Sequence, residues 1–154
     1  MSPEIKVIEQ EPVTMLSIRE TVQNSQIKSK MGEMYGQLWM YMERKNIEVV
    51  GPPFAVYHDY DQESCDMECG FPTAGPEKGE GNIKPSSAPG GKCVFTIYVG
   101  PYEKIMATYE MVKDFIRKEG LKPKKVMFER YLNDPATVKD PEELVTEIYW
   151  PVNE

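Results

Sequence analysis

The chain has 154 residues, 40% hydrophobic and 28% charged, which is typical of one globular domain that buries its own core. Its net charge of −7 argues against a nucleic-acid-binding face, because phosphate contacts need clustered lysine and arginine. No apolar run approaches the roughly 18 residues of a membrane span. The start, MSPEIKVIEQ, lacks the basic and then apolar character of an export signal, so we expect a cytoplasmic protein without membrane contact.

The predicted elements occur twice along the chain. YGQLWMYMERKNI (35–47) aligns with YEMVKDFIRKEGL (109–121) at an offset of 74 residues, and both have the apolar spacing of an amphipathic helix. Asn46 and Gly120 fall at the same place in the two copies, and each suits the left-handed residue that ends a helix. One strand is predicted before each helix and two after it. In chain order the predicted strands are 13–22, 54–59 and 68–72, then 92–99, 128–133 and 147–151, with a possible extra strand at 5–9.

This pattern predicts an α+β fold built from duplicated strand–helix–strand–strand modules. We expect one domain over residues 1–154, with pseudo-repeats at about 13–72 and 92–152. The two modules should form one curved antiparallel sheet with both helices on one face. Eight of the nineteen residues of 73–91 are Gly or Pro, which predicts a loop inside the domain rather than a packed element.

Strand alternation divides the side chains into two sets. An apolar set should face the helices: Phe54, Val56, Cys65, Met67, Cys69, Phe71, Phe95, Ile97, Val126, Phe128, Ile148 and Trp150. The other set mixes carboxylates with four tyrosines: Arg19, Tyr57, Glu68, Thr96, Tyr98, Met127, Glu129, Tyr131, Glu147 and Tyr149. A solvated sheet face would explain the charges. The aromatic area exceeds what solvation needs, so we interpret this second face as a ligand-binding cleft.

Three segments resemble a known family: GPPFAVYHDYDQESCDMECGFP, GPYEKIMATYEMVKDFIRKEG and FERYLNDPATVKDPEELVTEIYWPV. They are similar to the gyrase-inhibitor-like small-molecule-binding domain. The same domain serves as the effector-binding domain of AraC-type and multidrug-sensing MerR-type regulators. The resemblance runs from Val13 to Val152. It implies the duplicated fold, an aromatic cleft and an acidic residue in that cleft. The matching residue is Glu129 of FERYL, whose counterpart in the first copy is Ala55.

Three functions remain open at this point. The first is binding of a lipophilic, cationic or aromatic small molecule, because ring faces attract cations and a carboxylate pairs with them. The second is hydrolysis of cyclopropane-bearing electrophiles, an activity of some members of the family, with Glu129 as general base and Tyr57 or Tyr131 as its hydrogen-bond partner. The third is a protein partner such as DNA gyrase. The predicted ligand-binding residues are Trp39, Tyr57, Tyr98, Met127, Glu129, Tyr131 and Tyr149.

The remaining sequence features bear on metals, cofactors and partners. The three cysteines and the single histidine form no metal-binding set, and no phosphate loop is apparent, so we expect no metal or cofactor. About a dozen residues precede the first module, with no helix-turn-helix, so we expect a stand-alone protein without direct nucleic-acid binding. A monomer or weak dimer is expected. Glu68 and Glu147 match each other across the repeat and favour a structural pair that bonds across the module junction.

Overall fold

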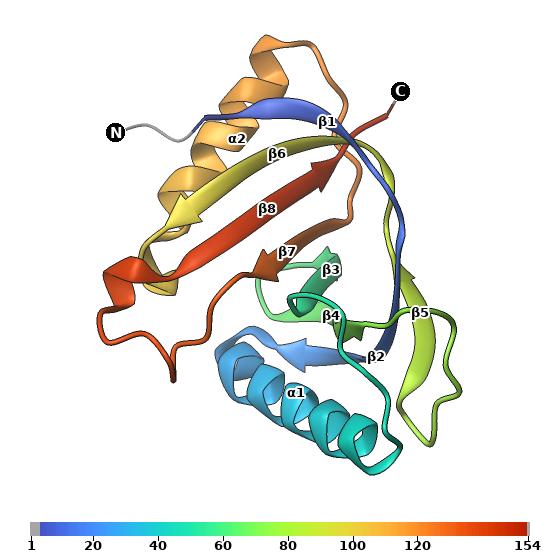
Figure 1. Cartoon of the computed structure of the whole chain (residues 1–154). Helices are drawn as coiled ribbons and strands as arrows, with labels where there is room; N and C mark the ends of the chain where they lie inside the picture. The colour runs from blue at the N-terminus through green and yellow to red at the C-terminus, as the bar shows by residue number, and fades with distance from the viewer. Residues whose placement is uncertain (1–3, 154) are drawn as a thin grey trace. The chain divides into compact units, whose positions relative to one another are not determined.

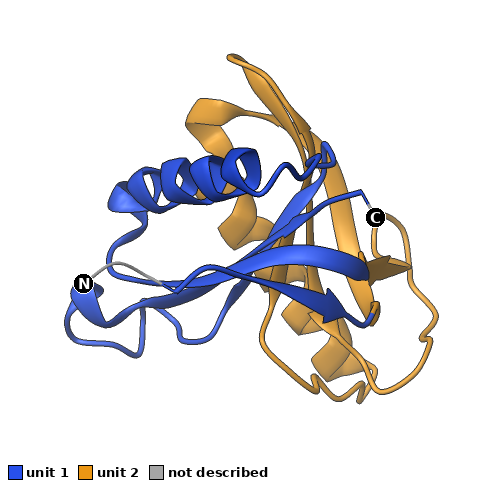
Figure 2. Cartoon of the chain, turned by 90° about the horizontal axis from the view of Figure 1, so that it is seen from above, with its two compact units in different colours: residues 1–11, 90–154 blue, residues 12–89 orange. Residues whose placement is uncertain are grey.

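We analysed a computed structural model of the chain that describes residues 4–153 (Figure 1). The chain divides into two compact units: unit 1 holds residues 1–11 and 90–154, and unit 2 holds residues 12–89 (Figure 2). Neither helix of the described chain is long and apolar enough to cross a membrane.

Unit 2 contains the first module. Its elements are β2 (Val13–Gln23), η1 (Asn24–Gln26), α1 (Ile27–Arg44), β3 (Phe54–Tyr60), β4 (Ser64–Pro72) and β5 (Lys84–Ala88). The strands are antiparallel in the order β3-β4-β2-β5. Apolar residues of α1, among them Met34, Leu38 and Met42, pack on Leu16 and Met67 of the sheet, which gives this unit its own core.

Unit 1 contains the second module and the N-terminal strand. Its elements are β1 (Lys6–Gln10), β6 (Gly91–Val99), η2 (Tyr102–Lys104), α2 (Met106–Lys118), β7 (Met127–Tyr131), η3 (Pro141–Glu143) and β8 (Val145–Pro151). The order is β1-β6-β8-β7, again antiparallel, with α2 lying along this sheet (Figure 1). Val112 and Ile116 of α2 pack on Val94, Ile148 and Trp150 of the strands.

The predicted α+β class and the duplicated modules are confirmed, and so is the strand near the N-terminus. The two helix ends are also as predicted. Asn46 and Gly120 have φ of +56° and +66°, and the following amide in each case donates to a carbonyl of the last helical turn. Part of the predicted loop 73–91 is a strand instead. β5 lies there and pairs with β2. Pro85 is tolerated in β5 because β5 is an edge strand of its sheet.

The predicted side-chain faces are wrong for β6 and β7. Tyr98 and Met127 were expected away from the helix, yet both pack against the core under α2. Phe95 and Phe128 were expected under the helix, yet both contact Tyr149: Phe128 is stacked on its ring at a centroid distance of 4.6 Å, and the Phe95 ring is tilted against it at 5.0 Å. Alternation could not identify the helix-facing side because these strands carry large apolar side chains on both faces.

The same error affects β3 in unit 2. Tyr57 pairs in register with Met67 and packs against the α1 core, although we expected it on the open face. Val56 pairs with Glu68, so Val56 lies on the face opposite the helix. Strand β4 follows the prediction, since Cys65, Met67 and Cys69 are in the α1 core. The open tyrosine-lined face of the prediction is therefore not present in either module.

Candidate functional site

Glu129 is a buried carboxylate in the middle of β7, with 7% of its surface exposed. It pairs in register with Ile148, a residue of the core under α2, so its side chain points toward that helix. Oε1 accepts a hydrogen bond from the Tyr131 hydroxyl at 2.7 Å. Oε2 accepts one from the Tyr109 hydroxyl, which α2 supplies. Each carboxylate oxygen is thus held by one phenol.

Burial raises the pKa of Glu129 above its ordinary value, and the hydrogen bonds from Tyr109 and Tyr131 oppose that shift. Within residues 4–153, no lysine, arginine or histidine forms an ion pair with this carboxylate. A buried carboxylate normally has a cationic or metal partner, because desolvating an uncompensated charge is costly. Among the described residues only hydroxyl groups donate to Glu129, so a cation placed beside it would supply the missing charge.

Aromatic rings surround this carboxylate on two sides. The Tyr109 ring meets Trp150 edge to face at 6.3 Å, below α2. The Tyr131 ring meets Tyr102 edge to face at 5.8 Å, at the start of the helix. Met127 lies two residues before Glu129 on the same strand face. The site therefore combines one carboxylate with four rings and a methionine, all within unit 1.

The remaining predicted residues of unit 1 lie differently. The Tyr98 hydroxyl donates to the Pro101 carbonyl at 2.6 Å, so Tyr98 supports the loop before α2. Tyr149 lies on the other face of the sheet from Glu129, where it stacks on Phe128. Its hydroxyl donates to Glu147. Tyr149 is thus separated from the Glu129 side chain by the sheet itself.

Two predicted residues belong to unit 2. Trp39 on α1 is 53% exposed and contacts Phe71 edge to face at 6.0 Å. Tyr57 is partly buried against the α1 core. Within its own module Tyr57 has no carboxylate two residues before it, since that position is Ala55.

Sequence reasoning missed Tyr109 and Tyr102 as parts of the site. Tyr109 is the first residue of the predicted helix segment 109–121, and it is buried, but its hydroxyl is directed at Glu129. The repeat offered a signal, because Tyr35 occupies the equivalent position. Where the second module has a carboxylate, the first does not, and the Tyr35 hydroxyl donates to the Phe54 carbonyl instead.

We expected Glu68 and Glu147 to form a structural pair across the module junction; the partners described for each glutamate lie in its own unit. Glu68 is 5% exposed and accepts hydrogen bonds from Ser17 at 2.5 Å and His58 at 2.7 Å. Glu147 lies 3.3 Å from the Arg130 guanidinium. Burial raises the pKa of Glu68, but the bonds from His58, Ser17 and Ser86 outweigh burial and hold this pKa below its ordinary value. Among the described residues, a nitrogen side chain thus contacts each of these glutamates, His58 for Glu68 and Arg130 for Glu147, whereas none contacts Glu129.

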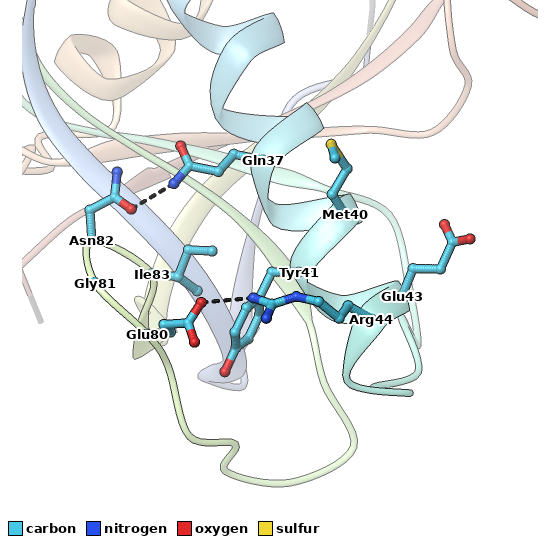
Figure 3. Close-up of a pocket in the computed structure, with 9 residues that line it drawn as sticks. All are labelled: Gln37, Met40, Tyr41, Glu43, Arg44, Glu80, Gly81, Asn82 and Ile83. Carbon is cyan, nitrogen blue, oxygen red and sulfur yellow. Dashed lines mark hydrogen bonds and ion pairs between the residues drawn. The ribbon is translucent and has the colours of Figure 1, made fainter.

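A separate surface cavity of about 780 Å³ lies in unit 2, between α1 and the loop before β5 (Figure 3). Two polar bridges cross it, Gln37 to Asn82 and Arg44 to Glu80, each at 2.7 Å. Its carboxylate Glu80 is already neutralised by Arg44. The second carboxylate that lines the cavity, Glu43, is exposed to solvent, whereas Glu129 is buried, so Glu129 is the stronger candidate. No set of three metal-ligating side chains occurs in the described chain.

The comparisons with known proteins agree with this fold. The sequence profile of the GyrI-like small molecule binding domain matches residues 3–153. The chain belongs to the GyrI-like family of small-molecule-binding domains. No curated protein gives a significant match.

Among solved structures, the C-terminal domain of EcmrR superposes with a TM-score of 0.83 at 24% identity, covering 100% of this chain and 99% of that one. In the complex of EcmrR with DNA the TM-score is 0.84 at 24% identity, with 99% of this chain covered but only 58% of the EcmrR chain. A hydrolase from Listeria innocua superposes at 0.68 with 17% identity, covering 99% and 93%. SAV2435 bound to tetraphenylphosphonium superposes at 0.58 with 15% identity, covering 97% and 94%. At these identities the likeness shows the fold alone.

Proposed function

We propose that this GyrI-like chain binds lipophilic, cationic or aromatic small molecules at the Glu129 site. This proposal specifies the ligand class and the place of the small-molecule binding that the family implies. The observation that supports this most is the buried carboxylate of Glu129, which has two phenol donors and no cationic partner in the described chain. A ligand cation would gain a charge-assisted contact there, in surroundings of low dielectric that strengthen it.

The ring content of the site favours the same class of ligand. Rings attract a nearby cation by about 0.5–2 kcal/mol each, more when the contact is desolvated. Tyr131 and Tyr102 are the partly exposed rings at the site, while Tyr109 and Trp150 are buried. SAV2435, which shares the fold, binds tetraphenylphosphonium, a lipophilic cation. We therefore propose Glu129, Tyr131 and Met127 as ligand-contacting residues, with Tyr98 supporting the loop. Trp39 and Tyr57 stay predictions. Tyr149 is not proposed as a ligand contact, because it lies on the other face of the sheet.

Two ligands of the same shape and opposite charge test this proposal. Tetraphenylphosphonium and tetraphenylborate differ in the sign of their charge and little in size, so their affinities isolate the electrostatic part of recognition. By calorimetry, tetraphenylphosphonium should bind and tetraphenylborate should not. Glu129→Gln should weaken the cation by about 1–3 kcal/mol, the range for a charge-assisted contact. Equal binding of both ions, or no effect of Glu129→Gln, would contradict a carboxylate that recognises charge.

A hydrolase is the second candidate. Burial raises the pKa of the Glu129 carboxyl, and a phenol donates to it at 2.7 Å; a raised pKa makes a carboxylate a stronger general base. The Listeria innocua hydrolase shares this fold. On this hypothesis Glu129 would take a proton from water as that water forms a C–O bond to a cyclopropane carbon; the strained C–C bond of the ring would break, and its electron pair would pass into the conjugated acceptor of the electrophile. Glu129→Gln would cut turnover by about 100- to 10,000-fold. Product formation beyond one equivalent per protein would support turnover, and a stop at one equivalent would identify a trap.

A further inference from the structure

Tyr102 lies at the outer side of the Glu129 site. On the inner side, Tyr109 is 5% exposed beneath α2 and packs against Trp150. On the outer side, Tyr131 and Tyr102 are both partly exposed, and their rings meet edge to face at 5.8 Å. Within unit 1, a ligand therefore reaches the carboxylate past this tyrosine pair more easily than past Tyr109.

The position of Tyr102 is set by a short, firmly held turn. The Gly100 amide donates to the Leu144 carbonyl at 2.8 Å, and the Tyr98 hydroxyl donates to the Pro101 carbonyl at 2.6 Å. Gly100 has φ of +146°, and a β-carbon there would lie 2.8 Å from the Tyr98 hydroxyl oxygen. Only glycine fits this backbone closely enough to let the turn pass over Tyr98. The turn thus fixes the position of the Tyr102 backbone, from which the ring extends.

Charge also places Tyr102 near the site. Burial, then the negative charges of Asp134 and Glu129, raise the pKa of the Tyr102 phenol. The phenol therefore stays protonated at neutral pH. Its ring packs edge to face on Tyr131.

The duplication gives an independent argument. The offset of 74 residues places Lys28 of the first module opposite Tyr102 of the second. The first module has Ala55 where the second has Glu129. The module that carries the carboxylate is thus also the one that carries an aromatic ring at this turn.

We propose that Tyr102 is a specificity-determining residue of the Glu129 site: its ring covers the Tyr131 side of the carboxylate, and the ring of a bound aromatic cation takes its place against Tyr131. This inference rests on the proposed function for the identity of the ligand, but the covering role of Tyr102 can be tested without any ligand.

The ligand-free test measures access to Glu129. Water-soluble carbodiimide with glycine ethyl ester converts accessible carboxyl groups to amides, which mass spectrometry quantifies residue by residue. Tyr102→Ala should speed labelling of Glu129 by about three- to tenfold, the factor that corresponds to loss of an edge-to-face pair. Tyr102→Phe keeps the ring and should label like the parent protein. Glu147, which Arg130 holds on the other face of the sheet, is the internal control.

Unchanged labelling of Glu129 in Tyr102→Ala would overturn the inference. An equal rise at Glu129 and Glu147 would also overturn it, because it would mean general loosening of unit 1. A stopped-flow arm with tetraphenylphosphonium separates the two proposals. Faster association and dissociation in Tyr102→Ala, with both rates near the parent values in Tyr102→Phe, is the expected result. If labelling responds as predicted but the parent protein binds no cation, the covering role stands and the proposed ligand class fails.

Discussion

The Tyr131 hydroxyl donates to Oε1 of Glu129 at 2.7 Å, from a position two residues further along the same strand. Residues two apart on a strand share a face, so β7 itself places the phenol beside the carboxylate. The second phenol, Tyr109, comes from α2. The Glu129 carboxylate therefore connects β7 to α2 by hydrogen bonds, and the same carboxylate is the candidate ligand contact.

Removing the Tyr109 hydroxyl should affect both stability and ionisation. In Tyr109→Phe the carboxylate loses one donor, and we expect a loss of about 1–3 kcal/mol in the free energy of unfolding at neutral pH. Because this hydrogen bond lowers the pKa of Glu129, the pKa should rise further in the variant. Urea unfolding and a carbon-13 NMR titration of Glu129 measure the two effects.

Tyr35→Phe is the matched control, since Tyr35 is equivalent in the repeat and donates to the Phe54 carbonyl. It should also cost stability but leave the Glu129 titration unchanged. A Glu129 titration that is identical in Tyr109→Phe and the parent protein would argue against the hydrogen bond.

The stability of Glu129→Gln should depend on pH in a defined direction. The pKa of Glu129 is raised in the folded protein, so the unfolded chain releases this proton first as the pH rises. The residue therefore lowers the free energy of unfolding progressively from its unfolded pKa up to its folded pKa. The glutamine variant avoids this loss. It should match the parent protein in acid and exceed it in stability at neutral pH, by urea unfolding from pH 4 to 8. A variant that is less stable at neutral pH would contradict the absence of a cationic partner.

Glu68 should show the opposite dependence. Its folded pKa is lowered, so it contributes stability above its unfolded pKa, and this contribution is lost as the pH falls through the folded pKa. Glu68→Gln should lose about 1–3 kcal/mol at neutral pH, the cost of disrupting a buried charged network, and converge with the parent protein in acid. Chemical unfolding over the same pH series tests both glutamates together. A difference that persists unchanged in acid would show that packing, not charge, explains the loss.

Two glycine substitutions should have opposite signs. In Gly100→Ala the new β-carbon meets the Tyr98 hydroxyl oxygen at 2.8 Å, at φ of +146°, so we expect a loss of about 1–3 kcal/mol. In Gly32→Ala, within α1, the β-carbon meets no heavy atom within 4 Å, so we expect a gain of about 0.5–1 kcal/mol from helix propensity. Thermal unfolding of both variants is the measurement. Similar stability in the two would contradict the geometry of the turn at Gly100.

Much of the fold could be predicted from the sequence, because the repeat shows which segments correspond. The helix ends at Asn46 and Gly120 followed from residue type, since few residues adopt a positive φ. Strand β5 could not be predicted, because the Gly and Pro residues around Lys84–Ala88 are typical of loops. Pairing with β2, a contact distant in sequence, makes it a strand.

The site was predicted in part. Glu129 stood out because it is the single carboxylate in a strand of large side chains that has no counterpart in the first module. Its surroundings did not follow from alternation. Met127 and Phe128 are equally apolar, so the pattern could not show which side of β7 faces α2, and we placed Glu129 on the wrong face. Tyr109 was hidden because a tyrosine in a helix stripe looks like core until its hydroxyl partner is known.

The most direct test of the central claim, that Glu129 is the charge that recognises a cation, is the pH dependence of tetraphenylphosphonium affinity. A cation favours the ionised carboxylate, whose fraction grows as the pH rises through the raised pKa of Glu129. The dissociation constant, measured by calorimetry from pH 5 to 8, should therefore fall with rising pH in the parent protein and stay level in Glu129→Gln. Binding that is equally tight in both proteins and independent of pH would contradict the account.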